Sequence, residues 1–405
     1  MGGQNQNQGQ GDWVELLPDL LDVIVKSLDS YCDYVRLRAV CKRWNLVLPK
    51  CPKSKKLSQL PWLVLPFDDG NDTLRPLYNL IEKKVYHLEL PETRNKLFRG
   101  SCFGWLVMVE RGPTLQLFNP FTRAKIDLPP ITTFPDIRAY QADRRGDEYT
   151  LVSRNGVTYT HGKFDILKFY ITKVVLSSSP ALSVHDNDIM AVSIYGEFRT
   201  LAYCRLGDDG WTAIPTRCIC FEDVIFHEGK IYAVTCTGKV LVCDMSMSGP
   251  LKGVWIRAEP PKIRVGSHYK YLVGTSSGLL MVERCFDVNV KYLHRHRMKQ
   301  YCYKTSGFNI YKLQSRGKKQ RWSKVNSLGD YVLLLGLNFS SCILPHNFPD
   351  CKPNRIYYTD DELDTQYAEV IGGYDIGVFN LEDGSIERLA GRDILYPPPI
   401  WVVPE

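Results

Sequence analysis

The sequence has no apolar run long enough to cross a membrane. Its longest, from Tyr331 to Phe339, is of strand length and is broken by Gly336, whereas a membrane helix needs about 20 apolar residues. The first eleven residues lack the basic start and apolar core of a secretory signal. Gln6 stands where a myristoylation motif has Ser or Thr. We therefore expect a protein of the nucleus, the cytoplasm or both, with no membrane partner.

Metal-binding patterns are also missing. The 13 cysteines are dispersed and form no CxxC pair, which excludes the two-pair spacing of a structural zinc site. Four of them lie in apolar, strand-like runs: Cys204, Cys236, Cys243 and Cys342. Free cysteine packs as a small hydrophobic residue, so we expect buried thiols, no metal and no cofactor.

Catalytic motifs are absent as well. The eight histidines occur singly or in expected loops, without HExxH, and no Gly-x-Ser-x-Gly or Gly-Lys-Ser/Thr loop is present. The acidic run Asp360–Asp364 lacks the alternation and the glycine of a calcium loop. Such a run is typical of a solvated turn. We expect no catalytic residue and no enzymatic activity.

What the chain does contain is the composition of a folded protein. Of its 405 residues, 44% are hydrophobic and 23% charged. The 23 Tyr, 16 Phe, 8 Trp, 30 Gly and 24 Pro favour many short strands and turns. Residues 1–11 contain only Gly, Gln and Asn after the initial Met, which predicts a disordered tail.

Residues 12–50 have helical periodicity. Pro18 and Asp19 suit the first turn of a helix, and apolar residues then recur at three and four: Leu20, Leu21, Ile24, Val25 and Leu28. A second short helix is expected after Asp29–Ser30, and a third is expected to carry Val40, Trp44 and Val47. Three helices in about 40 residues make a core too small for independent stability, so this unit needs a partner or a packed neighbour. The basic, proline-bearing segment 51–60 is the expected linker.

This segment resembles a known family. Residues 13–24 (WVELLPDLLDVI), Leu28 and residues 35–44 (VRLRAVCKRW) closely resemble an F-box, in which Leu-Pro precedes Leu and Ile at helical spacing and Val-Cys-Lys-x-Trp. The resemblance implies docking on the SKP-type adaptor of an SCF ubiquitin ligase and, through it, association with a cullin and a RING subunit. It assigns adaptor binding to Leu17, Pro18, Leu21, Ile24, Leu28, Val40, Cys41 and Trp44. Periodicity leaves open which of these face the adaptor and which the unit's own core.

Residues 61–405 show strand patterns instead. Fifteen short apolar runs are separated by turn signals: 85–90, 105–110, 115–119, 173–176, 189–195, 201–206, 223–227, 231–236, 240–244, 272–275, 279–283, 308–313, 331–337, 355–358 and 376–380. No helical period of useful length occurs among them. We expect an all-β domain.

Internal similarity narrows this domain to a propeller. Gly100–Glu110 resembles Gly274–Glu283, and an aromatic residue closes a strand–turn unit at Trp211, Trp255 and Trp322. Propeller blades repeat every ~40–50 residues and pack aromatics between them, so this length predicts about six blades. A β-sandwich or a pair of barrels is the alternative. The expected fold is mostly β, with a small three-helix F-box before a large propeller.

A second resemblance covers the β region. Leu117–Arg123 with Asp127–Pro130 resembles a strand pair of plant F-box-associated domains. Segments 348–361, 377–379 and 397–401 are similar to the kelch-like domain of unknown function typical of plant F-box proteins. The double-glycine signature of kelch repeats is poorly matched in this sequence. The resemblance implies a non-catalytic substrate-recognition subunit that binds a target protein for ubiquitination; it names no substrate-binding residue.

Two basic clusters, in the predicted loops 291–304 and 316–321, leave a second function open. Tyrosines are interleaved with Lys, Arg and His in the first, and such clusters can contact phosphate while aromatics stack on bases. The excess of 51 Lys and Arg over 44 Asp and Glu is small for a nucleic-acid-binding domain. A nucleic-acid-binding or general scaffold propeller is therefore the alternative. An acidic or phosphorylated protein segment would suit the same loops.

Overall fold

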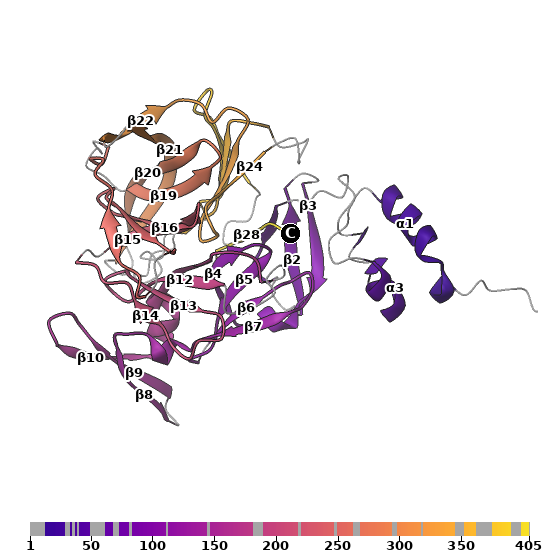
Figure 1. Ribbon diagram of the computed structural model, residues 1–405, viewed down its shortest axis with the longest axis horizontal. Coiled ribbons are helices and arrows are strands. Elements are labelled where there is room, and N and C mark those ends of the chain that lie inside the picture. The colour runs from indigo at the N-terminus through magenta and orange to yellow at the C-terminus, as the bar shows by residue number, and fades with distance from the viewer. Residues whose placement is uncertain are drawn as a thin grey trace, which may run out of the picture. The chain divides into compact units, whose positions relative to one another are not determined.

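The structure is a computed structural model that describes residues 13–28, 33–34, 37–38, 40–48, 61–67, 73–80, 83–110, 112–143, 146–180, 189–217, 220–246, 249–261, 268–293, 298–316, 319–344, 352–361, 375–389 and 398–404. The chain divides into two compact units, Met1–Leu60 with Glu405 and Pro61–Pro404. Figure 1 shows helices in the first and strands in the second. Within the described ranges, no helix combines the length and apolarity needed to span a bilayer.

The first unit contains a 3-10 turn and two described α-helices: η1 Trp13–Glu15, α1 Pro18–Ser27 and α3 Lys42–Val47. Helix α1 begins at Pro18 as predicted, with Asp19 in its first turn. The second expected helix lies largely on residues 29–32, 35–36 and 39, outside the described residues. Val40 precedes α3 instead of lying on it, because Cys41 is the N-cap residue.

The second unit is built from successive antiparallel sheets. One comprises β4 Leu97–Cys102, β5 Trp105–Val109, β6 Leu115–Phe118 and β7 Lys125–Leu128; the next comprises β11 Ile171–Leu176, β12 Met190–Tyr195, β13 Thr200–Arg205 and β14 Thr212–Ala213. Then come β15 Phe221–His227, β16 Lys230–Thr235, β17 Val240–Asp244 and β18 Gly253–Trp255, followed by β19 His268–Thr275, β20 Gly278–Leu293, β21 Met298–Arg316 and β22 Lys319–Val325. In each of these four sheets the strands follow chain order from one edge to the other.

Two further sheets contain crossovers. The five-stranded sheet runs β24 Ser341–Ile343, β23 Val332–Leu335, β25 Arg355–Tyr358, β26 Gly377–Asn380 and β27 Ile386–Arg388, with β23 and β25 parallel. The last joins both ends of the unit, in the order β28 Ile400–Val402, β1 Trp62–Val64, β2 Leu74–Asn79 and β3 Lys84–Glu89. Trp62 pairs with Val402 there, and Leu63 with Trp401.

These six sheets follow one another in a ring. Their inner strands contact in the order β28, β4, β11, β15, β19 and β24. The ring centroids of Tyr357 and Trp401 lie 6.3 Å apart and link the five-stranded sheet to the sheet that holds both ends. Trp62 and Trp401 are each 1% exposed, so pairing the first strand with the last buries two of the largest side chains.

The similar segments that predicted a repeat form equivalent strand pairs. Gly100–Glu110 includes the end of β4, the turn and β5, and Gly274–Glu283 includes the end of β19, the turn and the start of β20. A Cβ at Gly100 would lie 2.1 Å from the Val174 carbonyl oxygen of the next sheet, and a Cβ at Gly274 would lie 2.4 Å from the His227 ring of the preceding one. The glycines are needed because inner strands of adjacent sheets approach so closely.

An insertion that the sequence did not predict lies between β7 and β11. It forms a three-stranded sheet, β8 Ile137–Asp143, β9 Gly146–Val152 and β10 Thr158–Gly162. A short helical segment follows, α4 Lys163–Asp165 and η4 Ile166–Tyr170. The domain is mostly β, as expected, with this short helical segment as an addition that was not predicted. The strands of the insertion were not predicted because they present no apolar run; β10, for example, alternates exposed and half-buried residues.

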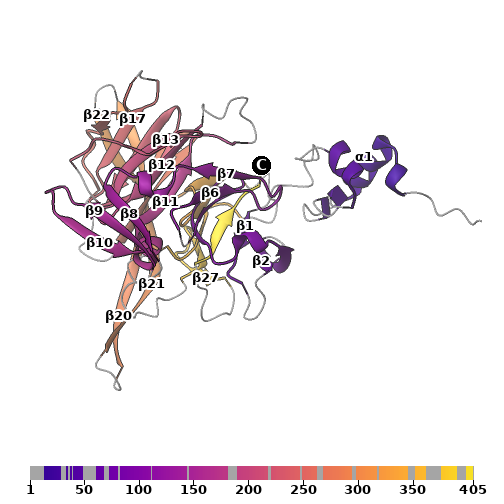
Figure 2. The same ribbon diagram turned by 90° about the horizontal axis from the view of Figure 1, so that it is seen from below.

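The first predicted basic loop was wrong. Residues 291–293 and 298–304 belong to the long hairpin of β20 and β21, whose pairing continues to Leu293 and Met298, and residues 294–297 lie outside the described residues. Figure 2 shows this hairpin extending well beyond the other strands. The second cluster, 316–321, lies at the tight connection where Arg316 of β21 pairs with Lys319 of β22.

Candidate functional site

The helical unit exposes an unusual amount of apolar surface. Helix α1 buries Leu21 and Val25 on one side, at 0% and 6% exposure. In contrast, seven large apolar side chains are exposed in the described part of this unit: Trp13, Leu17, Leu20, Val23, Val40, Leu46 and Val47. Exposed apolar side chains in this number on a small unit are typical of a surface that another protein covers. We call Leu17, Leu20 and Val23 the apolar ridge of α1.

The eight residues predicted to bind the adaptor separate into three groups, which are buried, half-buried and exposed. Leu21 and Trp44 are buried, Trp44 at 5% exposure with its indole N–H donating to the Trp13 carbonyl at 3.1 Å. Leu17 and Val40 are 62% and 59% exposed. Pro18 is exposed, and the remaining three are half-buried: Ile24, Leu28 and Cys41. Buried Trp44 therefore stabilises the unit's own core.

Cys41 also has a structural role in the unit. Its sulfur accepts the backbone N–H of Trp44 at 3.4 Å, which caps α3. This contact satisfies one of the free N–H groups at the start of a helix. The ridge residues Leu20 and Val23 were absent from the predicted set, because α1 is apolar on most sides and periodicity alone does not separate its core face from its outer face.

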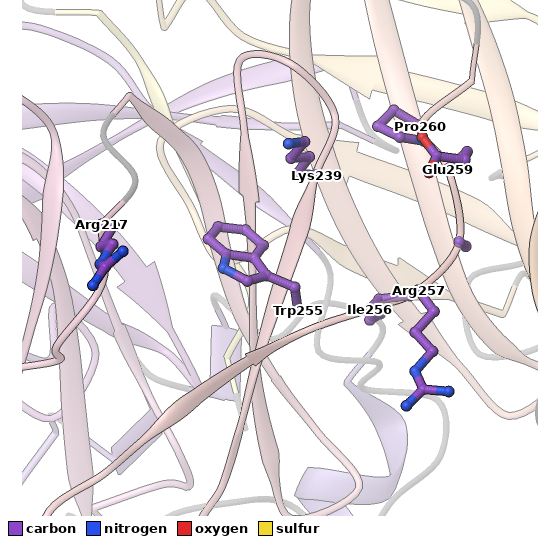
Figure 3. Close-up of a pocket in the computed structure, with 8 residues that line it drawn as sticks. Arg217, Lys239, Trp255, Ile256, Arg257, Glu259 and Pro260 are labelled. Atoms are coloured by element: carbon purple, nitrogen blue, oxygen red, sulfur yellow. The ribbon is translucent and has the colours of Figure 1, made fainter.

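A basic cleft lies along the outer strands of two neighbouring propeller sheets. Its first part is a cavity of about 570 Å³, lined by Arg217, Lys239, Trp255, Ile256, Arg257, Ala258, Glu259 and Pro260. Figure 3 shows the Trp255 indole in the middle of this site, with Arg217 to one side and Lys239 nearby. Trp255 belongs to the edge strand β18 and is 37% exposed.

The second part of the cleft is a cavity of about 1040 Å³ that shares Arg257. Its other lining residues come from β21 and β22: Lys312, Leu313, Gln314, Ser315, Lys319, Gln320 and Arg321. Together the linings carry six Lys or Arg side chains, and Glu259 is the single carboxylate among them. An aromatic ring amid positive charge favours an anionic ligand.

This cleft changes the reading of two predicted features. Trp211 packs between sheets as expected of a propeller aromatic, since its indole N–H donates to the Pro129 carbonyl at 2.9 Å. Trp255 instead lines the cleft. Lys319 and Arg321 of the second predicted basic cluster lie in the cleft as well, whereas Arg295, Arg297 and Lys318 fall outside the described residues.

The acidic run predicted to be a solvated turn is partly buried. Asp360 and Asp361 are 5% and 3% exposed. Fully buried Arg284 lies 3.0 Å from an Asp361 carboxylate oxygen and 3.2 Å from one of Asp375. Burial raises the pKa of Asp360 to about 7, against the opposing effect of a hydrogen bond from Tyr303. The ion pairs of Arg284 with Asp361 and Asp375 link β20 to the five-stranded sheet and stabilise the packing between them.

The four cysteines that were expected to be buried differ in their exposure. Cys204 and Cys243 are buried as expected, Cys342 is half-buried, and Cys236 is exposed, so that expectation was wrong for Cys236. Half-buried Cys285 lies in a cluster of potential metal ligands among the described residues. With His268 and Glu283, it places one nitrogen, one oxygen and one sulfur within 4.8 Å of one another.

Comparisons with known proteins agree with this architecture. The model of the KIB1-4 beta-propeller family matches residues 77–380. "F-box protein SKIP23" of Arabidopsis thaliana is 25% identical over 96% of this chain and 95% of its own length. "Probable F-box protein At4g22165" of the same plant is 26% identical over 95% and 93%.

Among solved structures, apo AztD from Citrobacter koseri is 10% identical with a TM-score of 0.31, covering 85% of this chain and 99% of its own. The computationally designed Ika8 protein is 10% identical with a TM-score of 0.33, covering 82% and 86%. TM-scores this low give neither likeness weight for fold or function.

Proposed function

The chain belongs to the KIB1-4 beta-propeller family, and from that premise we propose that it is a plant F-box protein, the substrate-recognition subunit of an SCF ubiquitin ligase. Its helical unit docks on the SKP-type adaptor and through it joins a cullin and a RING subunit. Its propeller, in which we assign the six ring-forming sheets as blades, binds a target protein for ubiquitination. The names of the Arabidopsis relatives support the F-box assignment.

The apolar ridge of α1 is the observation that carries this proposal. Leu17, Leu20 and Val23 are 62%, 49% and 61% exposed on a unit whose own core is small. Covering a side chain of this size is worth about 1.5–3 kcal/mol. An apolar groove of an adaptor supplies that cover, in the manner of an amphipathic helix laid into a groove.

The basic cleft is our assignment for target capture. Six cationic side chains and Trp255 gather there against one carboxylate, so the complementary target is an acidic segment of a protein. Lys and Arg in such a cleft attract the target and fix its orientation. We assign no catalytic residue to the chain and place it in the nucleus, the cytoplasm or both.

The proposal is tested by reconstitution. Full-length chain is co-expressed with a SKP-type adaptor, a cullin and a RING subunit and passed over a sizing column. We expect a single complex that contains all four proteins. Elution of the chain apart from the adaptor would overturn the proposal, whichever target the propeller recognises.

A further inference from the structure

His268, Glu283 and Cys285 form a three-residue cluster on one face of the sheet β19–β22. His268 of β19 pairs directly with Cys285 of β20. Glu283 precedes Cys285 by two residues on the same strand, and side chains two apart on a strand point to the same face. The pairing of β19 with β20 thus brings together an imidazole from one strand and a carboxylate and a thiol from the next.

Three polar atoms of this cluster are buried without hydrogen-bond partners. Glu283 has a side chain 4% exposed, and its Oε1 accepts no hydrogen bond. Both ring nitrogens of His268 are likewise without one, and the nearer approaches Glu283 Oε1 at only 3.9 Å. Each buried polar atom left in this state costs about 1–3 kcal/mol. A ligand that binds all three side chains would satisfy Glu283 Oε1 and one of the two His268 nitrogens.

Neighbouring residues hold the carboxylate and the sulfur in place. Lys324 donates to Asn309 Oδ1 at 2.8 Å, which turns the amide nitrogen of Asn309 inward. That nitrogen donates to Glu283 Oε2 at 3.0 Å and contacts Cys285 Sγ at 3.5 Å. The Glu283 oxygen left free is therefore the one that faces His268. Metal ligands are characteristically oriented by such outer hydrogen bonds.

From this geometry we propose that His268, Glu283 and Cys285 bind one Zn²⁺ ion. Zinc accepts nitrogen, sulfur and carboxylate oxygen together, whereas calcium and magnesium prefer oxygen alone. Ligand atoms around tetrahedral zinc lie roughly 3.3–3.8 Å apart. The 4.8 Å spread of this cluster closes by small side-chain rotations. Three protein ligands leave a fourth position for water.

Such an ion would join the first two strands of one propeller sheet. Binding to the folded chain alone stabilises it by mass action, and the Cys285 thiol releases its proton to solvent as the metal binds. Paired cysteines are the sequence signature of a structural zinc site, and one histidine, one glutamate and one cysteine on two strands carry no such signature.

Cobalt binding to the metal-stripped full-length chain under reducing conditions tests the proposal. Co²⁺ serves as the probe because a thiolate ligand gives it a charge-transfer band in the near ultraviolet. We expect one equivalent of Co²⁺ to produce this band and one equivalent of Zn²⁺ to abolish it. Cys285→Ser should lose the band, and Glu283→Gln should weaken binding at least tenfold.

Two controls separate the site from adventitious binding and from misfolding. Cys236→Ser removes an exposed thiol and should leave the titration unchanged. Lys324→Met changes an exposed residue that touches no ligand directly, yet it should weaken binding about 10–100-fold by releasing Asn309. The proposal is overturned if wild type shows no band, if the band survives Cys285→Ser, or if Cys236→Ser removes it.

Discussion

Lys173 and Asp223 form a fully buried ion pair between the inner strands β11 and β15. The Lys173 ammonium lies 2.6 Å from Asp223 Oδ1, and the two side chains are 2% and 0% exposed. The other carboxylate oxygen of Asp223 accepts the Ser340 hydroxyl at 2.7 Å and the Leu272 N–H at 2.9 Å. One carboxylate therefore connects four segments that come from different sheets or their connections.

Removing the lysine should strongly destabilise the propeller. Lys173→Met leaves the Asp223 charge buried without its partner, which costs roughly 3–5 kcal/mol. Urea unfolding followed by tryptophan fluorescence measures the change. Lys26→Met is the control for an exposed ion pair, because Lys26 lies 2.7 Å from Asp22 on the surface of the helical unit, and its loss should leave the urea midpoint of the propeller unchanged. Equal effects of the two substitutions would show that the buried pair does not support the ring.

The stability of the propeller should depend on pH through Asp136. Burial raises the pKa of this carboxyl to about 6, against the lowering effect of a hydrogen bond from Tyr170, and nearby Glu197 raises it further. The folded chain therefore keeps a proton that the unfolded chain has released. This contribution is complete below about pH 4 and is lost as the pH rises through 6.

Asp136→Asn isolates that contribution. The free energy of unfolding of wild type minus that of Asp136→Asn should fall between pH 4.5 and 7, with a slope approaching one proton. Glu222 and Asp360, whose pKa values burial also raises, each to about 7, titrate in both proteins and cancel in the difference. Parallel stability curves would contradict the prediction.

Charge reversal in the basic cleft should weaken capture of acidic segments. Arg257 is shared by both parts of the cleft, and Lys312 lines the second. We expect Arg257→Glu with Lys312→Glu to lower affinity for a labelled hexaglutamate peptide at least tenfold in fluorescence anisotropy, and added salt to weaken wild-type binding. Lys125→Glu, an exposed site on β7, should have little effect. Tighter binding to single-stranded DNA than to the peptide would favour the nucleic-acid alternative instead.

The sequence predicts much of the propeller because its blades contain continuous apolar strands. Runs such as 173–176 and 332–335 are buried completely in the structure, and apolar strands buried on both faces are recognisable from composition alone. Strand β8, IRAYQAD, was missed because its residues lie mostly at intermediate or exposed positions. Its presence is decided by pairing with β9.

Site residues were harder to predict because tertiary contacts decide their roles. Asp361 has the local sequence of a solvated turn and is buried because Arg284, 77 residues away, is its partner. The F-box pattern identified α1 as a docking element, yet only the packing separates buried Leu21 from exposed Leu20. All eight adaptor-binding assignments, from Leu17 to Trp44, remain predictions.

The affinity of the full-length chain for a purified SKP-type adaptor tests the central claim most directly. The variant Leu17→Ser with Leu20→Ala removes two ridge side chains. It keeps α1 folded, since serine is a good residue at the N-cap position that Leu17 occupies and alanine is the best helix former. Isothermal titration should show at least a tenfold loss for this variant and less than a twofold change for Asp22→Ala on the same helix. Undiminished binding by the ridge variant would contradict docking through α1.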